Sequence, residues 1–367
     1  MAVSITTVSA KTDRMISSSD PLPVATEEIT PAWFSKILGK RVKEVAIDET
    51  IHGTASKILV KLTYEDSPDS LIAVCVKGGF NPAILALQPS LCQMYQLEAE
   101  FYHYIAPTVK MRLPDAQYCA IDEVGGQGIV VLEDLKAAGY TFGNPLEAWP
   151  VDRVRAGVEQ LATLHARTWG GDPGDFPWLN REFSIRDIMR SLLSAESWGA
   201  RFEGDTRPPV PDQLADRKRM ARAFETLWNN TDTKMNCIVH GDSHVGNTFI
   251  TPTGEPGFLD WQCIHRGSAI HDVAYFIAGS LSIDDRRENE GPLFQHYLDT
   301  LHKKGGPRFD KEGLWEEYRK HTLHGFIWSL ALSEMQPREL VDTMASRYCA
   351  AIMDLKTLEL LEGLESN

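Results

Sequence analysis

Apolar residues alternate with polar ones in the first part of the chain and recur at helical spacing in most of the remainder. Alternation over residues 45–47 and 58–62, followed by the apolar run 71–76, predicts three strands of an antiparallel sheet. The hairpin between the last two strands is expected at Pro68-Asp69. Before them, a Thr cap and i, i+3, i+4 spacing predict a short helix over residues 26–38.

The pattern after the third strand predicts a helix, two more strands and then a long helical region. The helix covers residues 91–105, the strands cover 117–122 and 128–132, and residues 151–169 form a strongly amphipathic helix. Further helices are expected over residues 185–195, 212–229, 294–302, 314–334 and 340–361. The expected fold class is therefore α+β, with an N-terminal antiparallel sheet and a mostly helical C-terminal part.

The length of the chain favours two lobes, because 367 residues exceed the usual size of a single compact core. Residues 1–25 are polar and end in a Pro-Leu-Pro stretch, which predicts a flexible tail. We place the boundary between an N-terminal lobe, 26–135, and a C-terminal lobe, 136–367, near Leu135.

Composition limits the possible functions. The 37 Lys and Arg residues against 51 Asp and Glu give a net charge of −14, which disfavours nonspecific binding to nucleic acid. The six cysteines are scattered without C-x-x-C spacing and are expected to be reduced. The N-terminus lacks the apolar core of a signal peptide, and no apolar run reaches the roughly 18 residues of a membrane span. These features predict a soluble, cytoplasmic protein.

Candidate chemistry is concentrated in residues 238–261, where two short apolar runs flank a polar loop. Asp242 and Asn247 follow the first run, and Asp260 ends the second. Phosphoryl transfer to a hydroxyl needs a carboxylate that accepts the acceptor's proton and oxygen ligands for Mg²⁺. Asp242 is suited to the first role, and Asn247 and Asp260 are suited to the second.

The sequence His-Gly-Asp-Ser-His-Val-Gly-Asn, at residues 240–247, and the Leu-Asp pair at 259–260 resemble motifs of a known group. They are similar to those of the aminoglycoside phosphotransferase and choline kinase superfamily, which has the protein-kinase fold. The resemblance implies a two-lobed kinase-like fold, ATP and Mg²⁺ as cofactors, and a small-molecule hydroxyl acceptor. Gln262, in Leu-Asp-Trp-Gln, is similar to the ecdysteroid-kinase-like branch, which implies a sterol-like, amino-alcohol or other metabolite as acceptor.

The same resemblance implies roles for residues of the N-terminal lobe. Lys77 ends the third strand, where the family has the lysine that contacts the α and β phosphates, and Glu98 is its expected partner, with Glu100 as the alternative. The turn before the second strand is where a kinase covers the phosphates, so Ser56 or nearby amides would donate to a phosphate. The hinge would lie at 133–135, where backbone groups of Glu133 and Leu135 bind adenine.

Asp272, His165 and His240 can each be explained by a structural role as well as by a functional one. Asp272 precedes an apolar helix and would cap it, although related proteins keep an Asp here that braces the catalytic loop by hydrogen bonding. His165 lies on an apolar helix face, so a buried histidine bonded to backbone is favoured over a substrate contact. His240 is expected to orient the catalytic strand.

Two alternatives remain open from sequence. The pair His240 and His244 around Asp242 suggests a metal-dependent hydrolase, but nothing resembles the H-E-x-x-H helix motif. A kinase-like protein that binds a ligand without transfer would account for the poor glycine loop, in which Gly53 stands alone. The joint presence of Lys77, Glu98 and the Asp242 loop favours an active kinase.

Overall fold

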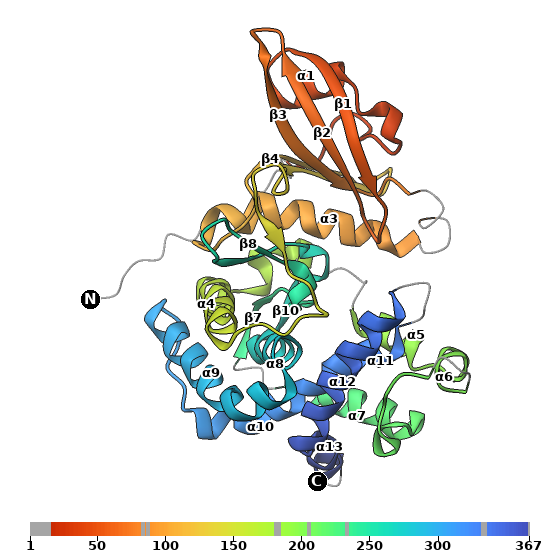
Figure 1. Cartoon of the computed structure of the whole chain (residues 1–367), viewed down its shortest axis with the longest axis vertical. Helices are drawn as coiled ribbons and strands as arrows, with labels where there is room; N and C mark the ends of the chain where they lie inside the picture. The colour runs from red at the N-terminus through yellow and green to blue at the C-terminus, as the bar shows by residue number, and fades with distance from the viewer. Residues whose placement is uncertain are drawn as a thin grey trace. The chain divides into compact units, whose positions relative to one another are not determined.

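A computed structural model describes residues 16–81, 85, 89–179, 185–203, 207–231, 235–331 and 336–365 of the chain. The chain divides into two compact units. Unit 1 comprises residues 1–107, 115–134 and 170–182, and unit 2 comprises 108–114, 135–169 and 183–367. Figure 1 shows the strands of unit 1 in red to yellow and the helices of unit 2 in green to blue.

Unit 1 is built on a five-stranded antiparallel sheet with the order β1-β2-β3-β5-β4. Its strands are β1 (Val42–Ile51), β2 (Ser56–Tyr64), β3 (Ser67–Gly78), β4 (Ala116–Asp122) and β5 (Gln127–Glu133). All five predicted strands are therefore confirmed. The predicted hairpin position is wrong, because Tyr64 pairs with Ser67, so the turn is Glu65-Asp66 and Pro68 lies within β3.

The predicted helix over residues 91–105 is present but changes its winding. Residues Cys92–Glu100 form the α-helix α3, and Phe101–Ile105 continue it as a π-helix. α3 packs against β4 and β5. The predicted N-terminal helix is likewise present as a 3₁₀ turn, Thr26–Glu28, followed by α1 (Pro31–Leu38), whose N-cap Thr30 accepts the amide of Trp33.

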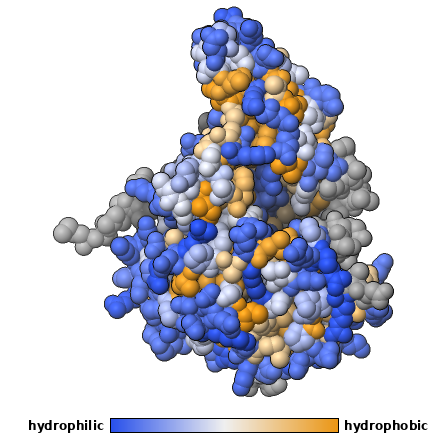
Figure 2. Space-filling view, viewed as in Figure 1, coloured by the Kyte–Doolittle hydropathy of each residue, from blue (hydrophilic) through white to orange (hydrophobic). Residues whose placement is uncertain are grey.

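The inward side chains of the sheet and α1 form the core of unit 1. Successive side chains of a strand point to opposite faces of the sheet, and in β5 both faces are buried. The core contains Phe34, Ile58, Val60, Leu62, Val74, Val76, Ile129 and Val131. Apolar side chains also reach the surface of this unit (Figure 2), among them Ile47, Ile51 and Leu71.

The segment before α1 packs on the sheet of unit 1. Ile16 and Leu22 are buried, and the backbone of Ile16 and Ser18 hydrogen-bonds to Ile121 of β4. The carbonyl of Pro23 accepts the side-chain amide of Gln127. The prediction of a flexible tail over residues 1–25 is therefore wrong for residues 16–23, because buried apolar side chains anchor them. Residues 1–15 lie outside the described part of the chain.

Unit 2 is mostly helical. Its α-helices are α4 (Val151–Thr168), α5 (Ile185–Leu192), α6 (Ala195–Phe202), α7 (Arg217–Asn229), α8 (Ala269–Ser280), α9 (Ile283–Lys303), α10 (Lys311–His321), α11 (Ile327–Leu330), α12 (Arg338–Asp354) and α13 (Thr357–Glu365). α8 is buried along its whole length, and α4 and α9 pack against it (Figure 1). This central helix positions the site described below.

Short strands in unit 2 support the loop that the sequence singles out. β6 (Thr141–Phe142), β8 (Thr248–Ile250) and β9 (Pro256–Phe258) form one sheet in the order β6-β8-β9, and β7 (Asn236–Val239) pairs with β10 (His265–Ser268). The predicted apolar runs on either side of the polar loop correspond to β7 and β9.

Some helix boundaries differ from the sequence prediction. The helix predicted over 294–302 is longer in the structure and covers all of α9. The prediction missed its first half because those residues are polar, show no helical apolar spacing and include Pro292. The helix predicted over 314–334 is divided into α10, the 3₁₀ segment Thr322–Phe326 and α11, and residues 332–335 lie outside the description. In the described residues, no helix is both long and apolar enough to cross a membrane.

Candidate active site

The loop after β7 carries Asp242, which is partly exposed, between the buried residues Gly241 and Ser243. Gly241 has φ +82°, a left-handed conformation, and a Cβ at this position would lie 2.2 Å from the carbonyl oxygen of Cys263. Only glycine therefore fits here without movement of the backbone. The Asp242 side chain that follows is 35% exposed.

Helix α8 holds this loop through Asp272. The Asp272 carboxylate is completely buried and accepts the backbone N–H groups of His240 at 2.7 Å and Gly241 at 3.0 Å. Ser243 donates its hydroxyl to the Asp272 carbonyl at 3.0 Å, and His271 Nε2 lies 3.2 Å from the carbonyl oxygen of Gly241. The expected bracing role of Asp272 is confirmed. Its interpretation as a helix cap is wrong, since α8 begins at Ala269 and Ser268 occupies the cap position.

His165 of α4 completes the support of Asp272. Its Nε2 lies 3.0 Å from Asp272 Oδ2 and its Nδ1 lies 2.8 Å from the hydroxyl of Tyr297. Burial by itself raises the pKa of Asp272, but the hydrogen bond and charge of His165 outweigh it and hold the pKa well below its usual range. His165 is buried as expected, although its partners are side chains rather than backbone groups.

The Asp242 carboxylate is held by two side chains of its own loop and by one side chain of α8. Asn247 Nδ2 donates to Oδ2 at 3.1 Å, the hydroxyl of Tyr275 donates to Oδ1 at 3.2 Å, and His244 Nε2 lies 3.6 Å from Oδ2. Burial raises the pKa of Asp242, but the attraction to His244 outweighs it and leaves the pKa well below its ordinary value. Asp242 is therefore ionised at neutral pH and can accept a hydrogen bond from a hydroxyl group.

Asn247 and Asp260, the predicted metal ligands, lie on neighbouring segments. The amide of Leu259 donates to the Asn247 carbonyl at 3.0 Å, which keeps Asp260 close to Asn247 in the fold. Asp260 adopts a left-handed backbone conformation, φ 67°, which is uncommon for a non-glycine residue. An amide oxygen and a carboxylate are hard donors that suit Mg²⁺, so this pair fits such an ion.

The loop histidines are committed to hydrogen bonds inside the protein. His240 Nδ1 accepts the amide of Asp242 at 3.3 Å, and its Nε2 lies 3.1 Å from the carbonyl oxygen of Leu259. His244 Nδ1 accepts the amide of Gly246 at 3.0 Å. With both ring nitrogens engaged, His240 orients the strand as expected and is a poor zinc ligand. No group of three or more His, Cys, Asp or Glu in the described ranges is arranged to hold a metal ion.

Lys77 and Glu98 form a buried ion pair within unit 1. Lys77 Nζ lies 2.9 Å from Oε1 and 2.7 Å from Oε2 of Glu98, and the two side chains are only 4% and 3% exposed. β3 supplies the lysine and α3 supplies the glutamate. Of the two glutamates that the sequence offered, Glu98 is thus the one paired with Lys77, while Glu100 is buried on the same helix.

The other predicted nucleotide contacts of the N-terminal part are engaged within the chain. The buried hydroxyl of Ser56 lies 3.1 Å from His52 Nδ1, so the side chain points to that ring. The amide of Glu133 donates to the carbonyl of Asp115 at 2.9 Å, and the carbonyl of Leu135 accepts the amide of Tyr140 at 2.9 Å. Burial raises the pKa of Glu133.

Sequence reasoning missed two residues at the site, Tyr275 and Trp328. Tyr275 lies in the unbroken apolar run of α8, where nothing distinguishes a functional tyrosine from a core residue. Trp328 lies in an apolar stretch at helical spacing, which is typical of a core residue. It is buried, yet its indole Nε1 donates to the Tyr275 hydroxyl at 2.8 Å.

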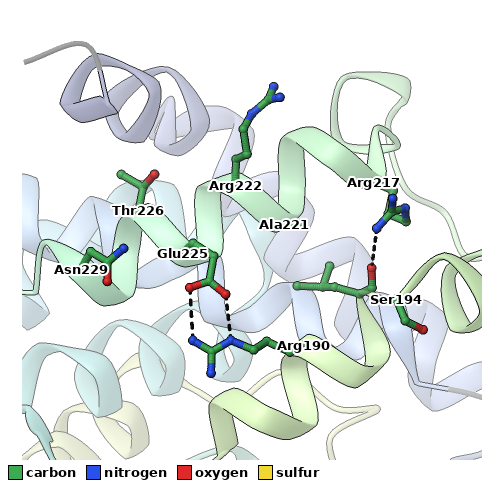
Figure 3. A pocket seen from close by; sticks show the side chains of 9 residues that line it. Arg190, Ser194, Arg217, Ala221, Arg222, Glu225, Thr226 and Asn229 are labelled. Atoms are coloured by element: carbon green, nitrogen blue, oxygen red, sulfur yellow. Dashed lines mark hydrogen bonds and ion pairs between the residues drawn. The ribbon is translucent and has the colours of Figure 1, made fainter.

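A separate pocket of about 420 Å³ lies between α5 and α7 and is rich in arginine. Figure 3 shows Arg190 held against Glu225 by two hydrogen bonds, whereas Arg222 points away from this pair. Arg217 donates to the carbonyl of Leu193 at 3.1 Å. Because Arg190 and Arg217 already have partners in the protein, this pocket offers little uncommitted positive charge.

A sheet with a buried lysine–glutamate pair, followed by a helical unit with an aspartate and asparagine loop, defines a phosphotransferase of kinase-like fold. A family model described as "Phosphotransferase enzyme family" matches residues 82–311, more than half of the chain. The chain belongs to this phosphotransferase enzyme family, which confirms the superfamily and the enzyme class predicted from sequence. The matched region contains Glu98, Asp242, Asn247 and Asp260, whereas Lys77 precedes it.

Solved structures show the same fold at low sequence identity. A candidate aminoglycoside phosphotransferase from Ralstonia eutropha is 14% identical, with a TM-score of 0.51 and coverage of 90% of this chain and 97% of that one. A microcompartment-associated aminopropanol kinase is 13% identical, with a TM-score of 0.52 and coverage of 88% and 94%. No curated protein matches the sequence.

Proposed function

We propose that this protein is a small-molecule kinase that transfers the γ-phosphoryl group of ATP to a hydroxyl of a metabolite. The observation that carries the proposal is the charge, exposure and fixed orientation of the Asp242 carboxylate. Its carboxylate is ionised, partly exposed and fixed by Asn247, Tyr275 and His244. A general base needs this combination, because the acceptor must reach a carboxylate that is already correctly oriented.

The transfer requires one proton and one phosphoryl group to move. Asp242 orients the acceptor hydroxyl and takes its proton, while the hydroxyl oxygen forms a bond to the γ-phosphorus. The bond between the γ-phosphorus and the bridging oxygen of ATP breaks, and ADP leaves with the electron pair. The products are ADP and the phosphate monoester, and the proton on Asp242 passes to solvent.

Further residues are assigned to the nucleotide and its metal ion. We assign Lys77 to the α and β phosphates of ATP, with Glu98 fixing its ammonium group through the buried pair. Asn247 and Asp260 would hold Mg²⁺, which neutralises the charge of the phosphates when it is bound. Neighbouring amides of the turn 52–54 are better candidates for phosphate donors than the buried hydroxyl of Ser56. We retain the segment of Glu133 and Leu135 as the adenine-binding hinge.

The acceptor class is assigned from the segment around Asp260. Gln262 follows Asp260 in the Leu-Asp-Trp-Gln form, which favours a sterol-like, amino-alcohol or other secondary metabolite over an aminoglycoside. The fold shared with an aminopropanol kinase is consistent with a small hydroxylated acceptor. The proposed partners are therefore a nucleotide and a small molecule, with no nucleic acid.

A screen of hydroxylated metabolites with γ-labelled ATP and Mg²⁺ tests the proposal. Wild-type protein should label at least one acceptor, while Asp242→Asn should bind nucleotide but lose nearly all transfer, and Asp260→Ala should lose it through the metal. Asp299→Asn, an exposed carboxylate on α9, is the matched control and should retain activity. Tight nucleotide binding without transfer to any acceptor would favour the kinase-like binding protein instead, and ester hydrolysis with bound zinc would favour the hydrolase.

A further inference from the structure

A chain of two hydrogen bonds leads from the buried core of unit 2 to the Asp242 carboxylate. The indole N–H of Trp328 donates to the hydroxyl oxygen of Tyr275 at 2.8 Å, and that hydroxyl donates to Asp242 Oδ1 at 3.2 Å. Trp328 is 6% exposed and Tyr275 is 1% exposed. The indole is a donor only, so the direction of both bonds is fixed, with the Tyr275 hydroxyl proton directed at the carboxylate.

Packing leaves the Tyr275 side chain little freedom to point elsewhere. Its ring stacks on that of Tyr348, with centroids 5.1 Å apart and planes at 14°, and the ring of His324 lies across it at 4.8 Å. The hydroxyl of Tyr348 donates to the backbone carbonyl of Tyr275 at 3.0 Å. The ring of Trp328 in turn contacts the ring of His244 edge-on, with the centroids 5.1 Å apart.

The two oxygens of the Asp242 carboxylate consequently have different neighbours. Tyr275 holds Oδ1, while Asn247 donates to Oδ2 and His244 lies near the same atom. Partners on both oxygens restrict rotation about the bond that carries the carboxylate. A base that must meet an acceptor hydroxyl within hydrogen-bonding distance gains from this restriction, because small misalignment costs rate.

We propose that Tyr275 and Trp328 are positioning residues for Asp242, acting as a relay in which the indole orients the tyrosine hydroxyl and the hydroxyl orients the base. This inference rests on the proposed function of Asp242 as the base. The relay joins α11 to the catalytic loop through α8, so α11 contributes to the alignment of the base. Neither residue belongs to the loop motif by which the site was found.

The variants Tyr275→Phe, Trp328→Phe and their combination test the relay with MgATP and water as the phosphoryl acceptor. Tyr275→Phe should lower kcat for ATP hydrolysis about tenfold while the KM for ATP stays unchanged, since a hydrogen bond to a charged group is lost. Trp328→Phe should have a smaller effect, and the double variant should match Tyr275→Phe, because both remove the same path. Tyr318→Phe, which changes a buried tyrosine of α10 that packs on Phe294 and Trp315 instead, should keep the wild-type kcat.

An NMR measurement tests the relay without activity. The indole ¹⁵N–H signal of Trp328 should shift in Asp242→Asn, and this shift should disappear when Tyr275→Phe is also present. Wild-type kcat in Tyr275→Phe, or an indole signal insensitive to Asp242→Asn, would overturn the relay. If wild-type protein transfers phosphate to no acceptor, including water, the proposed function fails, and the indole signal alone then decides whether the relay exists.

Discussion

His165 Nε2 lies 3.0 Å from Asp272 Oδ2, and both side chains are completely excluded from solvent. This contact joins α4 to α8 directly behind the catalytic loop. A buried carboxylate that loses one of its partners keeps the cost of burial without the compensating interaction. The contact therefore links the stability of unit 2 to the position of Asp242.

Replacing His165 with Phe should destabilise the protein by about 3 kcal/mol, because the Asp272 carboxylate stays buried while one strong partner is removed. Urea unfolding measures the change. His296→Phe provides the matched control, since His296 also pairs with an acid on α4, Glu159, but both side chains are partly exposed. Its loss should stay below about 1 kcal/mol, and equal losses in the two variants would contradict the assignment.

Asp272→Asn should show a pH-dependent loss of stability. The folded state lowers the pKa of Asp272 below the ordinary value of 3.8, so its ionised form stabilises the fold above that pH. This contribution is lost as pH falls through the folded pKa. Unfolding curves of wild type and Asp272→Asn should therefore differ most near neutrality, and the difference should begin to narrow only below about pH 4. A constant difference down to pH 3 would rule out this linkage.

Glu98→Gln should weaken both stability and nucleotide binding, because the buried ammonium group of Lys77 would lose the Glu98 carboxylate that fixes it. A loss of about 3 kcal/mol is expected in thermal or urea unfolding, together with weaker binding of a fluorescent ATP analogue. The control is Asp48→Asn, which breaks the half-exposed pair of Asp48 and Lys61 in the same sheet. It should change stability by less than about 1 kcal/mol and leave nucleotide affinity intact.

Gly241→Ala should cost far more than a left-handed glycine substitution usually does. Its new methyl group would meet the Cys263 carbonyl oxygen at 2.2 Å, so the backbone before Asp242 must move and kcat should fall with stability. Gly139→Ala has nearly the same φ, +83°, with no atom within 4 Å of the added methyl group. It should cost about 1–2 kcal/mol and keep full activity. Similar effects in both variants would show that backbone strain alone decides the outcome.

The sequence predicted those parts of the site that follow from order along the chain. Alternation located β3 and helical spacing located α3, and the resemblance to the phosphotransferase superfamily then implied that Lys77 and Glu98 form a pair. Periodicity also identified all five strands of unit 1. It failed at the hairpin, where Pro68 is a strong turn signal, because the register puts Pro68 inside β3 and the turn at Glu65-Asp66.

Residues that act through tertiary contacts gave no such signal. Tyr275 is one aromatic residue in a helix buried on all sides, where amphipathic periodicity cannot mark a functional face. Trp328 follows a 3₁₀ segment that no spacing predicted, and its role depends on meeting Tyr275 from another helix. The engagement of Ser56 with His52 likewise depends on how the turn folds back, which residue types alone do not determine.

Helix α8 supplies His271, Asp272 and Tyr275 to the loop that carries Asp242. The alignment of the base thus depends on a helix that is buried along its length, together with Asn247 and His244 of the loop and Trp328 of α11. Substitutions at exposed positions of unit 2 that contact neither α8 nor α11 should leave the geometry of proton acceptance unchanged. Because the residues that align the base are separate from the exposed positions, enzymes descended from one ancestor could change their acceptor and keep the same chemistry. The same separation makes directed evolution of acceptor preference practicable in this scaffold.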